Sequence, residues 1–141
     1  MSDLKKYVML FTIMGENKKI LIIEDEAMLS DLYKRTLEKE SFEVREVSDP
    51  TNVIQLIHTF APNLILLDIM LPGMSGIDLL KLIKSDPETN AIPIFMTTNV
   101  AEEESLQHAI ELGAEEYLNK SEYTPQGIAE HIKQYFRDHS D

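Results

Sequence analysis

Residues 19–26 read Lys-Ile-Leu-Ile-Ile-Glu-Asp-Glu, and residues 64–68 read Leu-Ile-Leu-Leu-Asp. Each stretch is a short run of aliphatic residues that ends in acidic ones and has the length of a β-strand. A strand without polar alternation is typical of a parallel sheet that is covered by helices on both faces. These two stretches therefore predict an α/β fold with acidic side chains at the carboxyl ends of its strands.

The rest of the chain repeats this alternation of strand and helix. Apolar residues recur at helical spacing over residues 28–39, and Asp49-Pro50 is a helix-start signal ahead of a helix at residues 53–60. We predict further strands at residues 42–47, 92–96 and 116–118, and further helices at residues 77–84, 101–112 and from 125 onwards. Each parallel crossover needs a helix and is right-handed. The pattern therefore favours a doubly wound, five-stranded parallel sheet in the flavodoxin-like order 2-1-3-4-5, with five helices.

The composition limits the class of protein. A chain of 141 residues has the length of one domain. Its 25 acidic and 13 basic residues disfavour contact with phosphate backbones, so we expect no direct binding of nucleic acid. The absence of cysteine excludes disulfides and thiolate zinc sites and fits a cytoplasmic location.

The first residues contain a short apolar segment. Residues 7–14 follow Lys5-Lys6, as in an export signal. The segment is far shorter than the roughly 20 residues that span a bilayer, and no small-residue cleavage site follows, so we predict neither export nor a membrane partner. Met14 precedes the first strand, which suggests that residues 1–13 are an upstream extension. We therefore expect a flexible or partly ordered extension at residues 1–17 and one domain at residues 18–141, with nothing left for an output domain.

The carboxyl ends of the strands are where functional side chains gather in open α/β sheets. The first strand ends in Glu24-Asp25-Glu26, and the third ends in Asp68. The predicted strand order makes these strands neighbours, so Glu24, Asp25 and Asp68 should converge. Clustered carboxylates repel one another unless a cation neutralises them, and an all-oxygen cluster suits Mg²⁺. For Asp25 or Glu26 alone, a helix N-cap is an equally good interpretation.

In order and spacing, these motifs resemble the receiver domains of response regulators, the CheY-like family, over about residues 18–138. The likeness is carried by the acids after the first strand, by Leu66-Leu67-Asp68, and by Met-Leu-Pro-Gly-Met-Ser-Gly at 70–76, Ile-Pro-Ile-Phe-Met-Thr-Thr at 92–98 and Gly-Ala-Glu-Glu-Tyr-Leu-Asn-Lys at 113–120. Each fragment alone is a weak signal, whereas their common order is specific. The resemblance implies a stand-alone two-component response regulator that accepts a phosphoryl group from a histidine kinase or phosphotransfer protein.

The resemblance implies a role for each acid. Asp68 is the expected phosphoacceptor. Asp25, Asp68 and the backbone carbonyl of Met70 are expected to bind Mg²⁺, or Mn²⁺ in its place. Glu24 is expected to act mainly through a bound water. This fits the chemistry, because phosphoryl transfer depends on positioning and on neutralising charge.

The resemblance also implies the other side of the site. Lys120 and Thr98 are expected to contact phosphoryl oxygens, and Tyr117 to turn inward as Thr98 moves, which makes a two-state switch. Thr97 is the adjacent candidate, but one residue of register reverses the face of a strand. Without the resemblance, Lys120 would be interpreted as solvated surface and Tyr117 as an ordinary surface aromatic.

Some positions depart from the family pattern. Ser121 follows the lysine where many members have proline, so we expect no cis peptide and a loop of less certain geometry. Asn99 stands where a small residue is usual, and its amide is expected to narrow access to the phosphoacceptor. Met70 and Val100 are apolar and unable to orient an attacking water, so we predict slow self-dephosphorylation.

Alternative functions fit less well. A phosphatase of the haloacid-dehalogenase kind has Asp-x-Asp after its first strand, whereas Asp68-Ile69-Met70 lacks the second acid and follows the third. An FMN carrier needs a Ser/Thr/Gly-rich phosphate loop that this sequence lacks. A degenerate receiver that takes no phosphate is disfavoured because all five key positions are filled.

We therefore expect a signalling protein that catalyses only its own phosphorylation and dephosphorylation. Its output would pass to a downstream protein through the face made by the fourth helix, fifth strand and fifth helix, from a monomer or a phosphorylation-dependent dimer. Pairing with the kinase would depend on residues 27–40. We expect the four histidines to lie on solvated helix surfaces.

Overall fold

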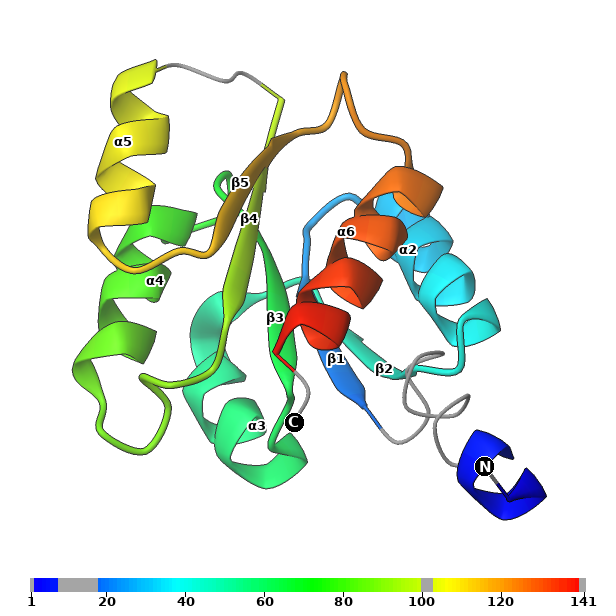
Figure 1. The fold of residues 1–141 in the computed structure, drawn as a ribbon. Coiled ribbons are helices and arrows are strands. Elements are labelled where there is room, and N and C mark those ends of the chain that lie inside the picture. The colour runs from blue at the N-terminus through cyan, green and yellow to red at the C-terminus, as the bar shows by residue number, and fades with distance from the viewer. Residues whose placement is uncertain (1, 8–17, 100–102, 140–141) are drawn as a thin grey trace.

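The computed structural model describes residues 2–7, 18–99 and 103–139 of the chain. Its centre is a five-stranded, all-parallel sheet in the order β2-β1-β3-β4-β5 (Figure 1). The strands are β1 (Lys19–Ile23), β2 (Glu43–Val47), β3 (Leu64–Asp68), β4 (Ile94–Thr98) and β5 (Glu116–Asn119). The predicted fold class and strand order are confirmed.

Helices cover both faces of the sheet. They are α2 (Ala27–Lys39), the 3-10 helix η1 (Pro50–Asn52), α3 (Val53–Phe60), α4 (Gly76–Ser85), α5 (Glu103–Glu111) and α6 (Pro125–Asp138). Figure 1 shows α2 and α6 on one face and α3, α4 and α5 on the other. The five predicted helices are therefore present, and residues 3–7 of the expected extension are also helical. The remainder of that extension, residues 8–17 with Met14, lies outside the described residues.

The aliphatic strands β1 and β3 form the middle of two cores. Leu21 and Ile23 pack with the α3, α4 and α5 side, whereas Ile20 and Ile22 pack with the α2 and α6 side. All four side chains are fully buried. A strand that is buried on both faces has no position for a polar residue until its end, which explains why the acids come at the end of each run.

Strand β4 differs from the prediction. It begins at Ile94 rather than at residue 92, because Pro93 has no N–H to donate; only its carbonyl joins the ladder, accepting from the Ile65 N–H at 3.0 Å. At its other end the strand runs past the predicted residue 96 to Thr98, with Thr97 opposite Asp68 in the register. Both threonines lie inside the sheet instead of after it.

No helix in the described part of the chain is long and apolar enough to cross a bilayer.

Candidate functional site: a buried acidic pocket

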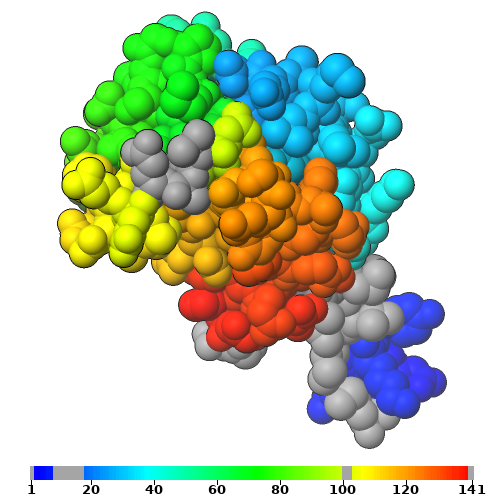
Figure 2. All heavy atoms as spheres, turned by 90° about the horizontal axis from the view of Figure 1, so that it is seen from above, coloured from blue at the N-terminus to red at the C-terminus, as the bar shows by residue number. Residues whose placement is uncertain are grey.

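The acids predicted from the first and third strands meet at the carboxyl ends of β1 and β3. Carboxylate oxygens of Glu24, Asp25 and Asp68 lie within 4.8 Å of one another. Glu24 is 2% exposed and Asp68 is 3% exposed, whereas Asp25 is open to solvent. Figure 2 looks onto this end of the molecule, where the blue, green, yellow-green and orange segments that follow the strands meet.

Lys120, directly after β5, lies between the two buried acids. Its Nζ is 2.6 Å from Glu24 Oε1 and 3.2 Å from Asp68 Oδ2, and its side chain is 7% exposed. It is therefore not the solvated surface lysine of the alternative interpretation. We call Glu24, Asp68 and Lys120, with Asp25 at the rim, the acidic pocket. Its two buried carboxylates face one ammonium group, which leaves a negative charge uncompensated when all three are ionised.

The uncompensated charge and the burial of the acidic pocket shift the pKa values of its side chains. Burial, then a hydrogen bond with Asp68, raises the pKa of Glu24 to about 8, although Lys120 opposes the shift. Burial alone would lower the pKa of Lys120, but its hydrogen bond with Glu24 and the charge of Asp68 outweigh that effect and raise it. Burial and the neighbouring Asp68 thus favour a proton on Glu24. A divalent ion would displace this proton.

The loop after β3 holds Asp68 by backbone contacts. The Met70 N–H donates to Asp68 Oδ1 at 3.2 Å, and the Gly76 N–H donates to the Ile69 carbonyl at 2.7 Å. A Cβ atom on Gly76 would lie 2.7 Å from the Ile69 Cα, closer than real Cβ contacts. Glycine is therefore required at position 76, where α4 begins against the back of the Asp68 loop. The Met70 side chain points to solvent and is 68% exposed.

The predicted switch residues lie in the two strands beside the pocket. Thr98 is 3% exposed, and its carbonyl accepts the Lys120 N–H at 2.7 Å. Tyr117 packs against the core on the α3, α4 and α5 side, and its buried hydroxyl has no hydrogen-bond partner in the described part of the chain. Tyr117 thus already points inward, so interpreting it as a surface aromatic is wrong.

The helix N-cap interpretation of the first acids holds for Glu26 by position alone. The N-cap of α2 is Glu26, and its side chain makes no capping hydrogen bond. Instead, Glu24 Oε2 lies 3.4 Å from the Glu26 N–H, within the pocket itself. Asp25 lies between them with its carboxylate exposed at the pocket rim.

Sequence reasoning missed the residue that shapes the Lys120 loop. Asn119 Oδ1 accepts hydrogen bonds from the Ser121 N–H at 2.9 Å and the Ser121 hydroxyl at 2.7 Å. Among the described residues there is no cis peptide, as expected from Ser121. The available signal was the asparagine itself, since Asn favours a side-chain turn to the backbone two residues on.

A second group of ionisable side chains lies at the opposite end of the sheet, where α3 and α4 end. His58 Nε2 is 3.3 Å from Asp86 Oδ2, and His58 Nδ1 is 3.1 Å from Glu88 Oε2. We call these three residues the histidine group. His58 is exposed on α3, as expected of a histidine on a solvated helix surface, and it also faces two carboxylates. Their ligand atoms are close enough to hold a metal ion, but each ring nitrogen already faces a carboxylate.

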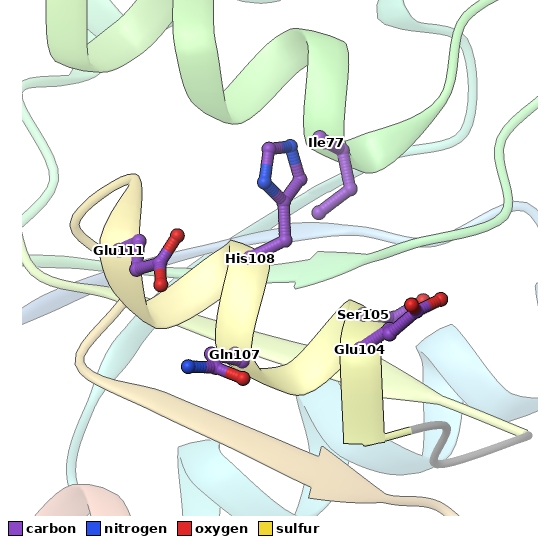
Figure 3. Close-up of a pocket in the computed structure, with 6 residues that line it drawn as sticks. All are labelled: Ile77, Glu104, Ser105, Gln107, His108 and Glu111. Carbon is purple, nitrogen blue, oxygen red and sulfur yellow. The ribbon is translucent and has the colours of Figure 1, made fainter.

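An open cavity of about 540 Å³ lies between α4 and α5 (Figure 3). It is lined by Ile77, Glu104, Ser105, Gln107, His108 and Glu111. Figure 3 shows His108 extending from α5 toward Ile77 on α4. The lining has neither the buried charges nor the converging carboxylates of the acidic pocket, so we place the chemistry in that pocket.

Comparison with known proteins agrees with this geometry. The phosphate regulon transcriptional regulatory protein PhoB of Klebsiella pneumoniae is 36% identical over 120 residues, which are 85% of this chain and 52% of PhoB. The chain thus spans about half the length of the curated relatives it matches. The solved structure of a CheY-like receiver domain protein from Methanospirillum hungatei JF-1 has a TM-score of 0.78 at 30% identity and covers 86% of this chain and 94% of its own.

A second solved structure, the Mn²⁺-bound form of the response regulator Rcp1, has a TM-score of 0.75 at 26% identity and covers 88% of this chain and 97% of its own. Residues 20–133 of the present chain match the family model of the response regulator receiver domain. This match includes both central strands, the buried acids and the lysine loop. The chain therefore belongs to the family of response regulator receiver domains.

Proposed function

We propose that Asp68 accepts a phosphoryl group from a histidine kinase or a phosphotransfer protein. The observation that carries this proposal is the buried position of Asp68, with a carboxylate oxygen 3.2 Å from the Lys120 ammonium and Glu24 beside it. Membership of the receiver family supports a phosphoacceptor over a phosphatase or an FMN carrier. Receiver domains are phosphoacceptors and not enzymes with a separate substrate; for this chain we propose catalysis of its own phosphorylation and dephosphorylation alone.

The chain's own groups are arranged for transfer of a phosphoryl group to Asp68. A carboxylate oxygen of Asp68 would form the new P–O bond while the P–N bond to the donor histidine breaks. The charge that arrives with the phosphoryl group needs a cation that water does not screen. Lys120 is that cation in our proposal, because it is buried and reaches Asp68. Thr98 would donate a hydrogen bond to another phosphoryl oxygen.

The carboxylates of the acidic pocket fit a divalent ion. Receiver domains bind Mg²⁺ or Mn²⁺ in their acidic pocket, and the Rcp1 structure contains Mn²⁺. In this chain we propose Asp25, Asp68 and the backbone carbonyl of Met70 as direct ligands, with Glu24 acting through water. When bound, the ion neutralises charge on the phosphoryl oxygens. The raised pKa of Glu24 comes from burial and then from Asp68, and it supports the fit because a nearby divalent ion would offset both effects.

We propose that phosphorylation is reported by Thr98 and Tyr117. The orphan Tyr117 hydroxyl supports a two-state side chain, because an unsatisfied buried hydroxyl costs about 1 to 3 kcal/mol and offsets part of the packing that holds the ring inward. The output face would consist of α5, β5 and α6 and bind a downstream protein. Leu106 and Ile110 are exposed on α5 and suit a protein contact.

We propose that the phosphorylated form is long-lived. Met70 is apolar and cannot orient an attacking water. Val100, which we expected to act in the same way, lies outside the described residues. Loss of label from isolated phosphoprotein, followed by intact mass, tests this. A half-life of only seconds would contradict it.

We further propose that residues 18–141 act as a stand-alone, cytoplasmic receiver with residues 1–17 as an extension, as a monomer or a phosphorylation-dependent dimer that contacts neither nucleic acid nor membrane. A second candidate is a receiver that controls an attached output domain. It is favoured by the coverage, because the chain matches only 52% of PhoB, which is named a transcriptional regulator. The intact mass of the native protein from its source cells distinguishes these two candidates.

Intact-mass analysis after incubation with acetyl phosphate and Mg²⁺ tests the proposed function. The wild type and Asp86→Asn should each gain one phosphoryl mass in a reaction that needs Mg²⁺, and Asp68→Asn should gain none. Asp86 is a matched control, because its carboxylate also has an ionisable partner, His58, but it lies in the histidine group and outside the acidic pocket. If the wild type gained no mass under conditions that label a known receiver, the proposal would fall.

A further inference from the structure

We propose that Asn119 is a positioning residue for Lys120: its side chain closes the loop after β5 and so holds the lysine against Asp68 and Glu24. The inference rests on the proposed function, in which Lys120 contacts the phosphoryl group. We call the hydrogen bonds that Asn119 accepts from the following residues the Asn119 turn.

The Asn119 turn consists of hydrogen bonds from the residues immediately after Lys120 back to Asn119. The side-chain Oδ1 of Asn119 accepts from the Ser121 N–H at 2.9 Å and the Ser121 hydroxyl at 2.7 Å. The backbone carbonyl of Asn119 accepts from the Glu122 N–H at 3.0 Å and the Tyr123 N–H at 3.1 Å. Four donors after Lys120 therefore converge on one residue before it.

The opposite side of Lys120 is fixed by the sheet. Its N–H donates to the Thr98 carbonyl at 2.7 Å, and Asn119 is in register with Thr98 at the end of the β4–β5 ladder. Lys120 is thus the first residue beyond the ladder. The sheet holds the Lys120 N–H, and the Asn119 turn holds the backbone that follows, so the turn helps to set where the lysine side chain starts.

The serine explains why such a turn is needed. A proline after Lys120 would restrict the backbone by its ring. Ser121 has no such restriction, but it supplies an N–H and a hydroxyl, both of which Asn119 Oδ1 uses. The pair Asn119 and Ser121 therefore performs by hydrogen bonding what a ring would perform by covalent geometry, with all peptides of the described chain trans.

The Asn119 side chain is separate from the carboxylates that could hold a metal ion. The hydrogen bonds that its Oδ1 accepts come from Ser121. Its loss should therefore shift Lys120 without changing the carboxylates that would bind Mg²⁺. A role confined to folding would predict a different result, with general loss of stability and of Mg²⁺ binding together.

The test compares Asn119→Ala with Asn119→Asp, which keeps an Oδ acceptor, and with Ser121→Ala, which removes only the hydroxyl. We would measure the rate of labelling by acetyl phosphate at saturating Mg²⁺ and, separately, Mg²⁺ affinity by NMR titration. Losing the side-chain bonds should slow labelling about five- to tenfold in Asn119→Ala and about twofold in Ser121→Ala. Asn119→Asp should label within about twofold of the wild-type rate, and Mg²⁺ affinity should stay within about twofold in all three.

Labelling of Asn119→Ala at the wild-type rate would overturn the inference, as would an equal loss of rate and Mg²⁺ affinity that Asn119→Asp does not rescue. If Asn119→Ala fails to fold, Ser121→Ala decides, and a wild-type rate for that variant would also overturn it.

Amide exchange at Ser121 gives a readout independent of phosphorylation. The amide should be protected in the wild type and Asn119→Asp, and lack of protection in the wild type would contradict the turn. Failure of the wild type to label would instead contradict the proposed function.

Discussion

The acidic pocket brings four ionisable side chains together and the histidine group three, at opposite ends of the sheet. They differ in their access to water. The buried side chains of the acidic pocket are 2% to 7% exposed, whereas those of the histidine group are 30% to 76% exposed. Both groups have the spacing of a metal site. Proximity alone therefore does not distinguish them.

Burial is what makes the acidic pocket chemically different. Charges in water are screened, and exposed ion pairs contribute about 0 to 1 kcal/mol. Charges removed from water need a partner, and in the acidic pocket burial and then Asp68 raise the pKa of Glu24 to about 8, although Lys120 opposes the shift. A pocket in this condition gains from a divalent cation and from a well-placed lysine. The histidine group has no comparable requirement.

The largest expected effect is that of Lys120→Met. Removing the cation leaves Glu24 and Asp68 without compensation, so the metal-free protein at pH 8 should lose about 3 to 5 kcal/mol of unfolding free energy. Urea unfolding followed by circular dichroism measures this, and added Mg²⁺ should narrow the difference. Arg35→Met is the control, because Arg35 pairs with Asp31 at 3.0 Å but is 65% exposed. Equal losses in the two variants would contradict the role given to burial.

Glu24→Gln should stabilise the metal-free protein at pH 8. The pKa of Glu24 is raised in the folded state, so between pH 4.5 and about 8 the folded protein holds a proton that the unfolded chain releases, and stability falls as pH rises through that window. Glutamine removes this penalty, with a gain of more than about 1.4 kcal/mol, the equivalent of one pKa unit.

Urea unfolding from pH 4 to pH 9 checks this prediction, with Glu88→Gln from the exposed histidine group as the control. The curve of Glu24→Gln should be flatter than that of the wild type, and the curve of Glu88→Gln should overlie the wild-type curve. The prediction would be contradicted if the unfolding free energy of the wild type rose between pH 5 and pH 8 while that of Glu24→Gln fell. The effect of Glu24 would then have the opposite sign.

Mg²⁺ should stabilise the acidic pocket and leave the histidine group unaffected. At a free concentration ten times its dissociation constant, the ion should add about 1.4 kcal/mol to the unfolding free energy. Asp68→Asn should lose most of this gain, and Asp86→Asn should keep it. Chemical unfolding with and without Mg²⁺ measures the gain. If Mg²⁺ added the same unfolding free energy to both variants, the ion would not bind at Asp68.

The smallest expected effect is that of His58→Gln. The imidazole and its two carboxylate neighbours are well exposed, so the unfolding free energy should change by less than about 1 kcal/mol. Labelling by acetyl phosphate should stay at the wild-type rate. A stability loss comparable to that of Lys120→Met would show that exposure does not separate the two groups.

The fold was predictable because its central strands are aliphatic at every position. Runs such as 20–23 and 64–67 are typical of strands between two helical layers, and the acids that end these runs could then be placed together. The start of β4 was missed because Ile92 continues the aliphatic pattern, while the missing N–H of Pro93 limits the ladder. The hydrophobic pattern of the sequence shows whether a residue is buried in the sheet, but it does not show which hydrogen bonds form at the ends of the strands.

The less predictable parts of the site depend on contacts between distant segments. Nothing in the sequence shows that Lys120 reaches Glu24, because the two residues meet only through the order of the sheet. The Asn119 turn is local and predictable from Asn-Lys-Ser, because an asparagine side chain favours a hydrogen bond to the backbone two residues on. The histidine group was unpredictable because His58 and Asp86 come from the ends of different helices.

The most direct test of the account is to identify the residue that carries the phosphoryl group. Reduction of the phosphoprotein with borohydride converts an aspartyl phosphate to homoserine, which peptide mass spectrometry can locate. We predict homoserine at position 68, dependent on acetyl phosphate and Mg²⁺, with the peptide containing Asp86 unchanged. Homoserine at another aspartate, or phosphate retained on serine, threonine or histidine with residue 68 intact, would contradict the assignment of Asp68 as the phosphoacceptor.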